Sequence, residues 1–140
     1  MGDLLVDRID AATRSRNMSR VRSFDTRAEL IVRRIAHALG YRFRGHRRDL
    51  PGTPDLVFPS RRVALFVNGC FWHRHDGCRR AATPKTRTAF WEDKFRKTLQ
   101  RDRRVNAALA DLGWRTEVIW ECETSDQDHV ACLLCCYLDR

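Results

Sequence analysis

The sequence predicts one α/β domain in which a small mixed sheet is flanked by helices. Segments with helical spacing of apolar residues, and short apolar runs bounded by turn residues, are the main observations. The chain has 140 residues and is 43% hydrophobic, which is enough for one domain with a hydrophobic core. In chain order we expect a helix at 26–40, strands at 55–58 and 63–68, a helix at 88–112, a strand at 114–121 and a helix at 125–139.

The first expected helix begins at Thr26 and ends at Gly40, because glycine is favoured just past a helix. Thr26 and Glu29 have the S/T-x-x-E spacing of a capping box, which gives both residues a structural role. The apolar residues that share one helical face in this prediction are Leu30, Ile31, Ile35, Ala38 and Leu39.

The two strands at 55–58 and 63–68 are joined by the short turn PSRR, so they predict a hairpin. The long helix at 88–112 is followed by Gly113, which closes it. Its charged residues lie opposite an apolar face made of Phe95, Leu99, Leu109 and Leu112.

The last helix, at 125–139, is amphipathic, with Ser125 as its expected N-cap. Cys132, Cys135 and Cys136 are expected to pack on its apolar face, although they are an alternative source of a metal ligand. The start MGDLLVDRID lacks a signal-peptide pattern, so reduced thiols rather than disulfides, and a cytoplasmic location, are expected. No apolar run reaches the roughly 18 residues that a membrane span needs.

The chain is strongly basic, with a net charge of +9 and 24 arginines among its 27 basic residues. Residues 61–104 hold 13 basic and 4 acidic side chains, whereas residues 105–140 hold 2 basic and 7 acidic ones. This asymmetry favours a polyanion ligand, most simply nucleic acid, although a basic surface also serves solubility. The Arg-rich segment 1–22 is expected to be an arm that orders on the ligand, ahead of a single domain at 23–140.

The stretch NGCFWHRHDGC at 68–78 concentrates possible metal ligands. Cys70, His75 and Cys78, joined by Cys122, can supply the four nitrogen and sulfur ligands of a structural zinc. The alternative is that the cysteines are small buried apolar residues and the histidines surface polar groups. His73 is left outside the tetrahedron and is therefore available for acid–base chemistry near neutral pH.

Three carboxylates have both a chemical and a structural interpretation. Asp55 follows Pro54 at the head of a strand, where it can begin a magnesium site, or it can cap its own turn. Glu29 is explained by the capping box, and Asp102 by ion pairs with neighbouring arginines of its helix.

Two pairs of adjacent aromatic residues stand among basic residues: Phe71 with Trp72, and Phe90 with Trp91. Both members of a pair cannot point into one core, so we expect one of each pair at the surface. Such side chains can wedge between base pairs; ordinary core packing is the alternative.

Together these residues resemble the very short patch repair (Vsr) DNA mismatch endonucleases over most of the chain. The resemblance lies in ATRSRNM (12–18), DTRAELIVRRI (25–35), LPGTPDLVF (50–58), VNGCFWH (67–73), TRTAFW (86–91), RDRR (101–104) and LGWRTEVIWEC (112–122).

The resemblance implies a restriction-endonuclease-like fold, a structural zinc and a magnesium-dependent nick on the 5′ side of the T in a T:G mismatch. It further implies a monomer whose partners are double-stranded DNA carrying the mismatch and mismatch-repair proteins. In catalysis, Asp55 and the carbonyl of Val67 would bind magnesium, His73 would handle a proton, Glu29 would support metal-bound waters, and Asp102 would belong to the site. Cys70, His75, Cys78 and Cys122 would bind zinc, Phe71, Trp72 and Trp91 would intercalate, and Met18 would lie in the minor groove.

The sequence departs from the family pattern at two places. Asn68 replaces a histidine that some members have near the scissile phosphate, and Asp76 and Gly77 lengthen the spacing between His75 and Cys78. LFVN also stands where general PD-(D/E)xK nucleases have their E-x-K half, so His73 carries more of the chemistry. Two other functions stay open at this point: a zinc-dependent DNA-binding module without catalysis, and a nuclease without mismatch preference.

Overall fold

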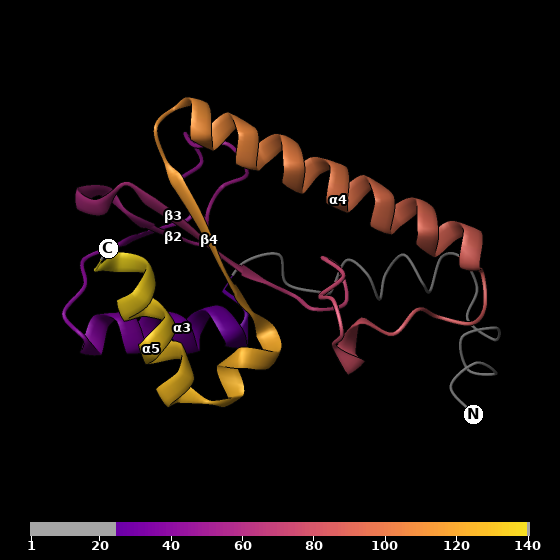
Figure 1. Ribbon diagram of the computed structural model, residues 1–140, viewed down its shortest axis with the longest axis horizontal. Coiled ribbons are helices and arrows are strands. Elements are labelled where there is room, and N and C mark those ends of the chain that lie inside the picture. Colours follow the sequence, from indigo (N-terminus) through magenta and orange to yellow (C-terminus); the bar gives the residue numbers. More distant parts are fainter. Residues whose placement is uncertain (1–24, 140) are drawn as a thin grey trace.

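The computed structural model describes residues 25–139 and shows a four-stranded mixed sheet with helices on both faces (Figure 1). The strands are β1 (Arg44–Gly45), β2 (Leu56–Phe58), β3 (Val63–Asn68) and β4 (Arg115–Trp120), and they lie in that order across the sheet. The helices are α3 (Arg27–Ala38), α4 (Thr88–Asp111) and α5 (Gln127–Leu138). This confirms the predicted α/β class and agrees with a restriction-endonuclease-like arrangement.

Pairing in the sheet follows from the connections between strands. β2 and β3 form the predicted antiparallel hairpin, with Leu56 opposite Leu65, and β1 adds to β2 antiparallel. β3 and β4 are parallel, with Val67 opposite Ile119, because the long helix α4 carries the chain back across the sheet between them.

Alternation along the strands divides the apolar side chains between two layers. Leu56, Phe58 and Leu65 point toward α3 and α5, where they form a core with Val32 and Leu134. The intervening residues point toward α4 and form a second, smaller cluster: Leu50, Val57, Ala64, Leu109 and Trp114. The sheet therefore packs against helices on both faces.

The apolar face predicted for the first helix is only partly right: Ile35 packs against the core and Ile31 is half-buried, but the other three residues are exposed. Leu30 and Leu39 are each 43% exposed, and the residues that α3 buries are Ala28, Glu29, Val32 and Ala36. Small residues let α3 lie close to the sheet and α5, and this close packing selects a face that a count of large apolar residues misses. In α4, Phe95 and Leu109 are buried as predicted, Leu99 is half-buried, and Leu112 is exposed.

The last helix also differs from its prediction. Its N-cap is Asp126, whose carboxylate accepts from the amide of His129, while Ser125 ends a preceding 3₁₀ turn (Glu121–Ser125). α5 packs through Val130, Leu134 and Leu138. Cys132, Cys135 and Cys136 are exposed, so the expectation that they pack in the core is wrong, because only one helical stripe meets the sheet. No helix within residues 25–139 is long and apolar enough to span a bilayer.

Candidate active site and metal centre

Asp55 stands one residue before β2, and its carboxylate crosses to the neighbouring strand. Its Oδ2 accepts a hydrogen bond of 2.7 Å from the backbone amide of Val67 in β3. The loop before it is held against α4, because Gly52 has a φ of +74° and a Cβ there would collide with Val105. Asp55 therefore does not simply cap its own turn; it is held at the end of β3.

Glu29 lies at the start of α3 and is only 2% exposed. Its amide donates to Oγ1 of the N-cap Thr26 over 3.2 Å, as the capping box predicts. Its carboxylate accepts instead from the amide of Asp25, at 2.9 Å, and lies beside Arg33 and His46. Glu29 thus has two roles: its backbone amide takes part in the helix cap, and its side chain supplies a buried carboxylate.

Asp55 and Glu29 are brought together by His46, whose Nε2 lies 3.1 Å from Oε2 of Glu29 and whose backbone amide donates to the carbonyl of Asp55. The pKa of Asp55 is raised to about 7, chiefly by burial and also by the negative charge of Glu29, against the Val67 hydrogen bond and the charge of Arg33. Two buried carboxylates that repel one another are relieved either by a shared proton or by a cation. Oxygen donors of this kind suit a hard divalent cation such as magnesium, so these residues fit the metal that the family implies.

The raised pKa of Asp55 predicts that stability falls as pH rises in the absence of magnesium. Below about pH 4 the stability that Asp55 contributes is fully present, since its carboxyl group is protonated in both the folded and the unfolded chain. As pH increases toward 7, the unfolded chain releases this proton more readily than the folded chain does, so the stability is lost. The free energy of unfolding measured in urea should fall by roughly 1–4 kcal/mol between pH 4.5 and 7.5. The Asp55→Asn variant should lack this component, and an identical slope in both proteins would contradict the prediction.

His73 pairs with Asp102 across the site. Its Nδ1 lies 2.7 Å from Oδ2 of Asp102, which belongs to α4, and its backbone amide donates to the carbonyl of Gly69. The expected ion pairs of Asp102 with neighbouring arginines are absent from the described residues, so that interpretation is wrong; the imidazole takes their place. A carboxylate on Nδ1 orients the ring and leaves Nε2 for a water or an oxygen of a substrate.

Asp55 and His73 are both attached to the end of β3. Val67 bonds the Asp55 carboxylate, and Gly69, two residues further along, bonds the His73 amide. Two residues of extended chain span about 7 Å. The end of β3 therefore brings the Asp55 carboxylate and the His73 imidazole into the same region, although the two residues are 18 positions apart in the sequence.

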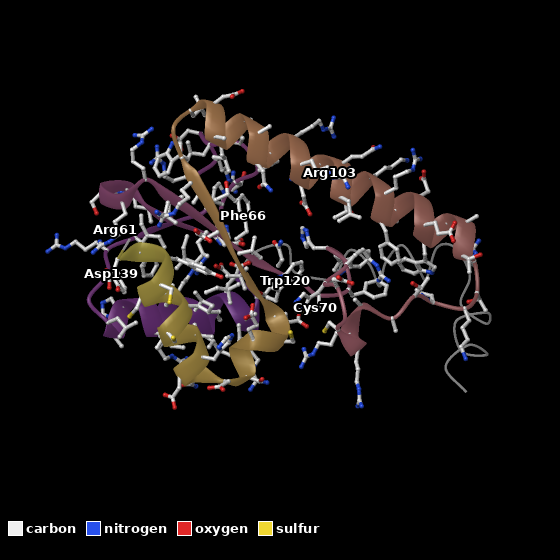
Figure 2. All side chains as sticks on the ribbon, in the orientation of Figure 1. Arg61, Phe66, Cys70, Arg103, Trp120 and Asp139 are labelled. Carbon is white, nitrogen blue, oxygen red and sulfur yellow. The ribbon has the colours of Figure 1, made fainter. Side chains whose placement is uncertain are left out.

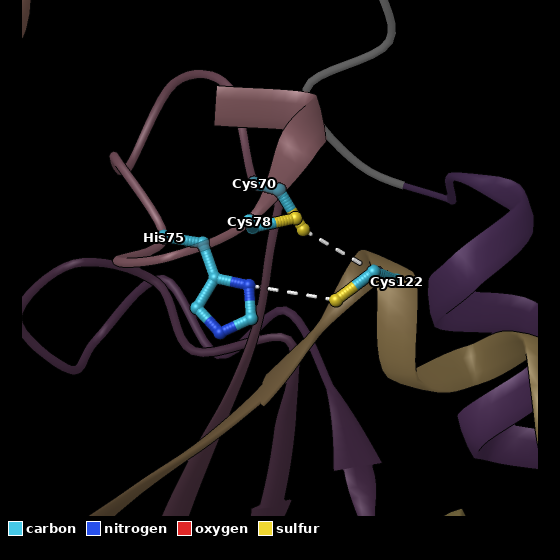
Figure 3. A group of neighbouring side chains, drawn as sticks. All are labelled: Cys70, His75, Cys78 and Cys122. Atoms are coloured by element: carbon cyan, nitrogen blue, oxygen red, sulfur yellow. Dashed lines mark hydrogen bonds between the residues drawn. The ribbon is translucent and has the colours of Figure 1, made fainter. Parts of the chain in front are cut away.

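Cys70, His75, Cys78 and Cys122 form a compact cluster of metal ligands (Figure 3). One ligand atom from each lies within 4.8 Å of all the others, and Cys122 Sγ is 3.4 Å from His75 Nδ1. Three sulfurs and one nitrogen at these separations match the donors and size of a tetrahedral zinc site. His73 is outside the cluster, in agreement with the sequence prediction, and the longer spacing to Cys78 is accommodated by Gly77, whose φ is +71°.

The electrostatics of this cluster also fit a cation. Burial and the neighbouring Cys70 and Cys78 raise the pKa of Cys122 to about 12, since adjacent thiolates repel one another. The pKa of Cys78 is lowered, chiefly by hydrogen bonding from the backbone of Arg80. The amide of Cys122 also donates to Sγ of Cys70 over 3.4 Å. Only Cys70 is buried, so burial as small apolar residues does not account for the group.

This cluster of candidate zinc ligands, called the zinc-type cluster below, connects the loop after β3 to the end of β4. His75 stacks on Trp120, the last residue of β4, with ring centroids 4.2 Å apart. Figure 2 shows Cys70 and Trp120 near this junction, away from Arg61 and Asp139 at the far side of the sheet. The cluster thus fixes the loop that carries His73.

The aromatic residues form a cluster between this loop and α4. Phe71 lies at its centre, with ring centroids 5.1 Å from Trp72, 5.4 Å from Trp91 and 5.2 Å from Phe95. The guanidinium of Arg74 covers the Phe95 ring at 3.9 Å. Phe90 is 41% exposed, as expected for one member of its pair, and Trp91 is half-buried. Phe71 and Trp72 are both half-buried and both contact Trp91, so the expectation that one of them is exposed is wrong.

Sequence reasoning missed two residues of the site, Arg33 and His46. Arg33 lies four positions after Glu29, the spacing of a helical ion pair, so a signal for it was present. His46 has no such signal, because only the pairing of β1 with β2 brings it close. Met18 and the arm at 1–22 lie outside the described residues.

Comparison with known proteins agrees with this geometry. Residues 6–80 match the family model for the DNA mismatch endonuclease Vsr. The chain is 54% identical over 122 residues to a type II nicking enzyme, V.XorIIP of Xanthomonas oryzae pv. oryzae, covering 87% of this chain and 89% of that protein. It is 42% identical over 118 residues to the DNA mismatch endonuclease Vsr of Escherichia coli K12, covering 84% of this chain and 75% of that protein. The chain therefore belongs to the Vsr family of DNA mismatch endonucleases.

Proposed function

We propose that this endonuclease nicks double-stranded DNA on the 5′ side of the T in a T:G mismatch and so starts very short patch repair. The buried pair of Asp55 and Glu29, at the strand end that also holds His73, is the observation that carries the proposal. Relatives described as a mismatch endonuclease and as a nicking enzyme support it.

Each residue of the site has a distinct task in this proposal. Asp55 and the carbonyl of Val67 would hold magnesium, which when bound stabilises negative charge on the phosphate. Glu29 orients water beside Asp55. His73 passes a proton at Nε2 to or from a water or leaving oxygen, and Asp102 holds the imidazole in the orientation that this transfer needs.

The remaining residues recognise distorted DNA. Phe71, Trp72 and Trp91 would intercalate beside the mismatch, where unstacking costs least. Cys70, His75, Cys78 and Cys122 would hold a structural zinc that keeps Phe71 and Trp72 in place. We further propose that 1–22 is a DNA-contacting arm, with Met18 in the minor groove, and that 23–140 is the endonuclease domain.

Strand-labelled duplexes test the substrate. Purified protein is incubated with a matched duplex and with one carrying a single T:G pair, each with and without magnesium. Cutting of the T strand only, 5′ to the T and only with magnesium, is the expected result. Tight binding without cutting would favour a non-catalytic DNA-binding module, and equal cutting of the matched duplex would rule out mismatch preference.

A further inference from the structure

Glu29 belongs to a group of four charged or ionisable residues. The other three are Asp25, Arg33 and His46. The guanidinium of Arg33 stands between the others, with NH1 2.8 Å from Oδ1 of Asp25 and NH2 3.4 Å from Oε2 of Glu29. The same NH2 lies 2.6 Å from Nε2 of His46. His46 Nε2 is in turn 3.1 Å from Glu29 Oε2, so all four residues meet at one point.

This group does not hold a metal of its own. Ligand atoms of Asp25, Glu29 and His46 lie within 4.8 Å of one another, which is the spacing of a cation site. The permanently charged guanidinium of Arg33 already occupies that position and contacts all three residues. The group is therefore an internal ion cluster whose cation is part of the protein.

We infer that Arg33 and His46 clamp the Glu29 carboxylate so that it stands beside Asp55 in the geometry that a divalent cation needs. This inference rests on the proposed function, because it assigns that cation to Asp55. Both are positioning residues, since the structure places them in contact with Glu29 rather than with the reacting atoms.

Successive contacts connect His46 to Asp55 through Arg33 and Glu29. Arg33 only donates hydrogen bonds, so Nε2 of His46 accepts in their contact, and His46 acts on the Glu29 carboxylate by fixing the guanidinium. The guanidinium and the amide of Asp25 then fix Oε2 of Glu29, whose negative charge acts on the carboxyl group of Asp55. The backbone amide of His46 also donates to the carbonyl of Asp55 at 3.4 Å. His46 is thus joined to both halves of the carboxylate pair.

Two residues of the clamp have an uncommon backbone conformation. Asp25 and His46 are both non-glycine residues with left-handed φ values, +56° and +49°. This conformation costs about 1–2 kcal/mol per residue and persists where surrounding contacts impose it.

Titration of Mn²⁺ into the zinc-loaded full chain without DNA tests the clamp directly. Wild-type protein should bind Mn²⁺ at a site that Asp55→Asn removes. His46→Ala should weaken this binding about 10- to 100-fold, the range typical of residues that orient a metal ligand. His46→Gln, whose amide oxygen can accept from Arg33, should stay within about threefold of wild type. His37→Ala, in the same protein but exposed at the end of α3, is the matched control and should be unchanged.

Nicking of a T:G duplex supplies a second readout. His46→Ala should raise the magnesium concentration needed for half-maximal rate by a similar factor, while KM for the duplex and the unfolding midpoint stay near wild type. Equal Mn²⁺ affinity in His46→Ala and wild type, failure of His46→Gln to recover, or no Mn²⁺ binding by wild type would each overturn the clamp. If Mn²⁺ binding responds as expected but no duplex is cut, the proposed function fails and the clamp stands.

Discussion

Asp55→Asn is expected to lower the single-turnover rate of nicking at a T:G pair by about a thousandfold or more. The amide oxygen of Asn can still accept the hydrogen bond from the Val67 amide, so the end of β3 should keep its structure. The negative charge that would hold the divalent cation is lost, and Glu29 alone cannot replace it. The measurement is cleavage of a 5′-labelled duplex with enzyme in excess.

Asp111→Asn is the matched control for this change. Asp111 is the exposed last residue of α4, and the substitution removes the same charge far from the end of β3. Its rate should equal that of wild type. A rate for Asp55→Asn within tenfold of the control would show that Asp55 does not bind the catalytic metal.

Loss of a zinc ligand should have the largest effect on stability. Cys122→Ala removes one of four ligands and separates the loop after β3 from the end of β4. Structural zinc contributes roughly 10–16 kcal/mol of apparent binding energy, against a net folding stability of about 5–15 kcal/mol. The variant should therefore lose most of its zinc, melt at a clearly lower temperature and lose mismatch binding. Elemental analysis and thermal unfolding measure the first two effects.

Cys132→Ala is the control for the zinc experiment. Cys132 is also a free cysteine, but it is exposed on α5 and outside the cluster. It should leave both the zinc content, about one equivalent per chain, and the melting temperature unchanged. Folded wild-type protein without zinc, or equal behaviour of the two variants, would refute the zinc assignment.

Local patterns predicted the elements and the zinc-type cluster well. Strand and helix positions follow from apolar spacing, which is a property of neighbouring residues. Cys70, His75 and Cys78 are close in sequence, and Cys122 follows directly after a strand, so tight turns and one strand pairing suffice to assemble them. The resemblance to the Vsr family supplied the roles that we propose for the individual site residues.

Burial was predicted less well because it depends on which helical face meets the sheet. Leu30 and Cys132 were expected to pack and are exposed, whereas Glu29 is buried in α3. A carboxylate has a cost when it is buried alone, so no local pattern predicts it. Its burial becomes understandable from its partners in the folded structure: Arg33 from the next turn, His46 just after the edge strand, and the amide of Asp25.

The sequence by itself determined the α/β class, the order of the elements and the set of candidate zinc ligands, because spacing and residue type act over a few neighbouring positions. Tertiary structure alone decided that Asp102 orients His73 and that His46 stands behind Glu29. The physical reason is that both contacts join elements that meet only when the sheet and α4 are assembled, and their energy comes from desolvated charge that has no sequence period.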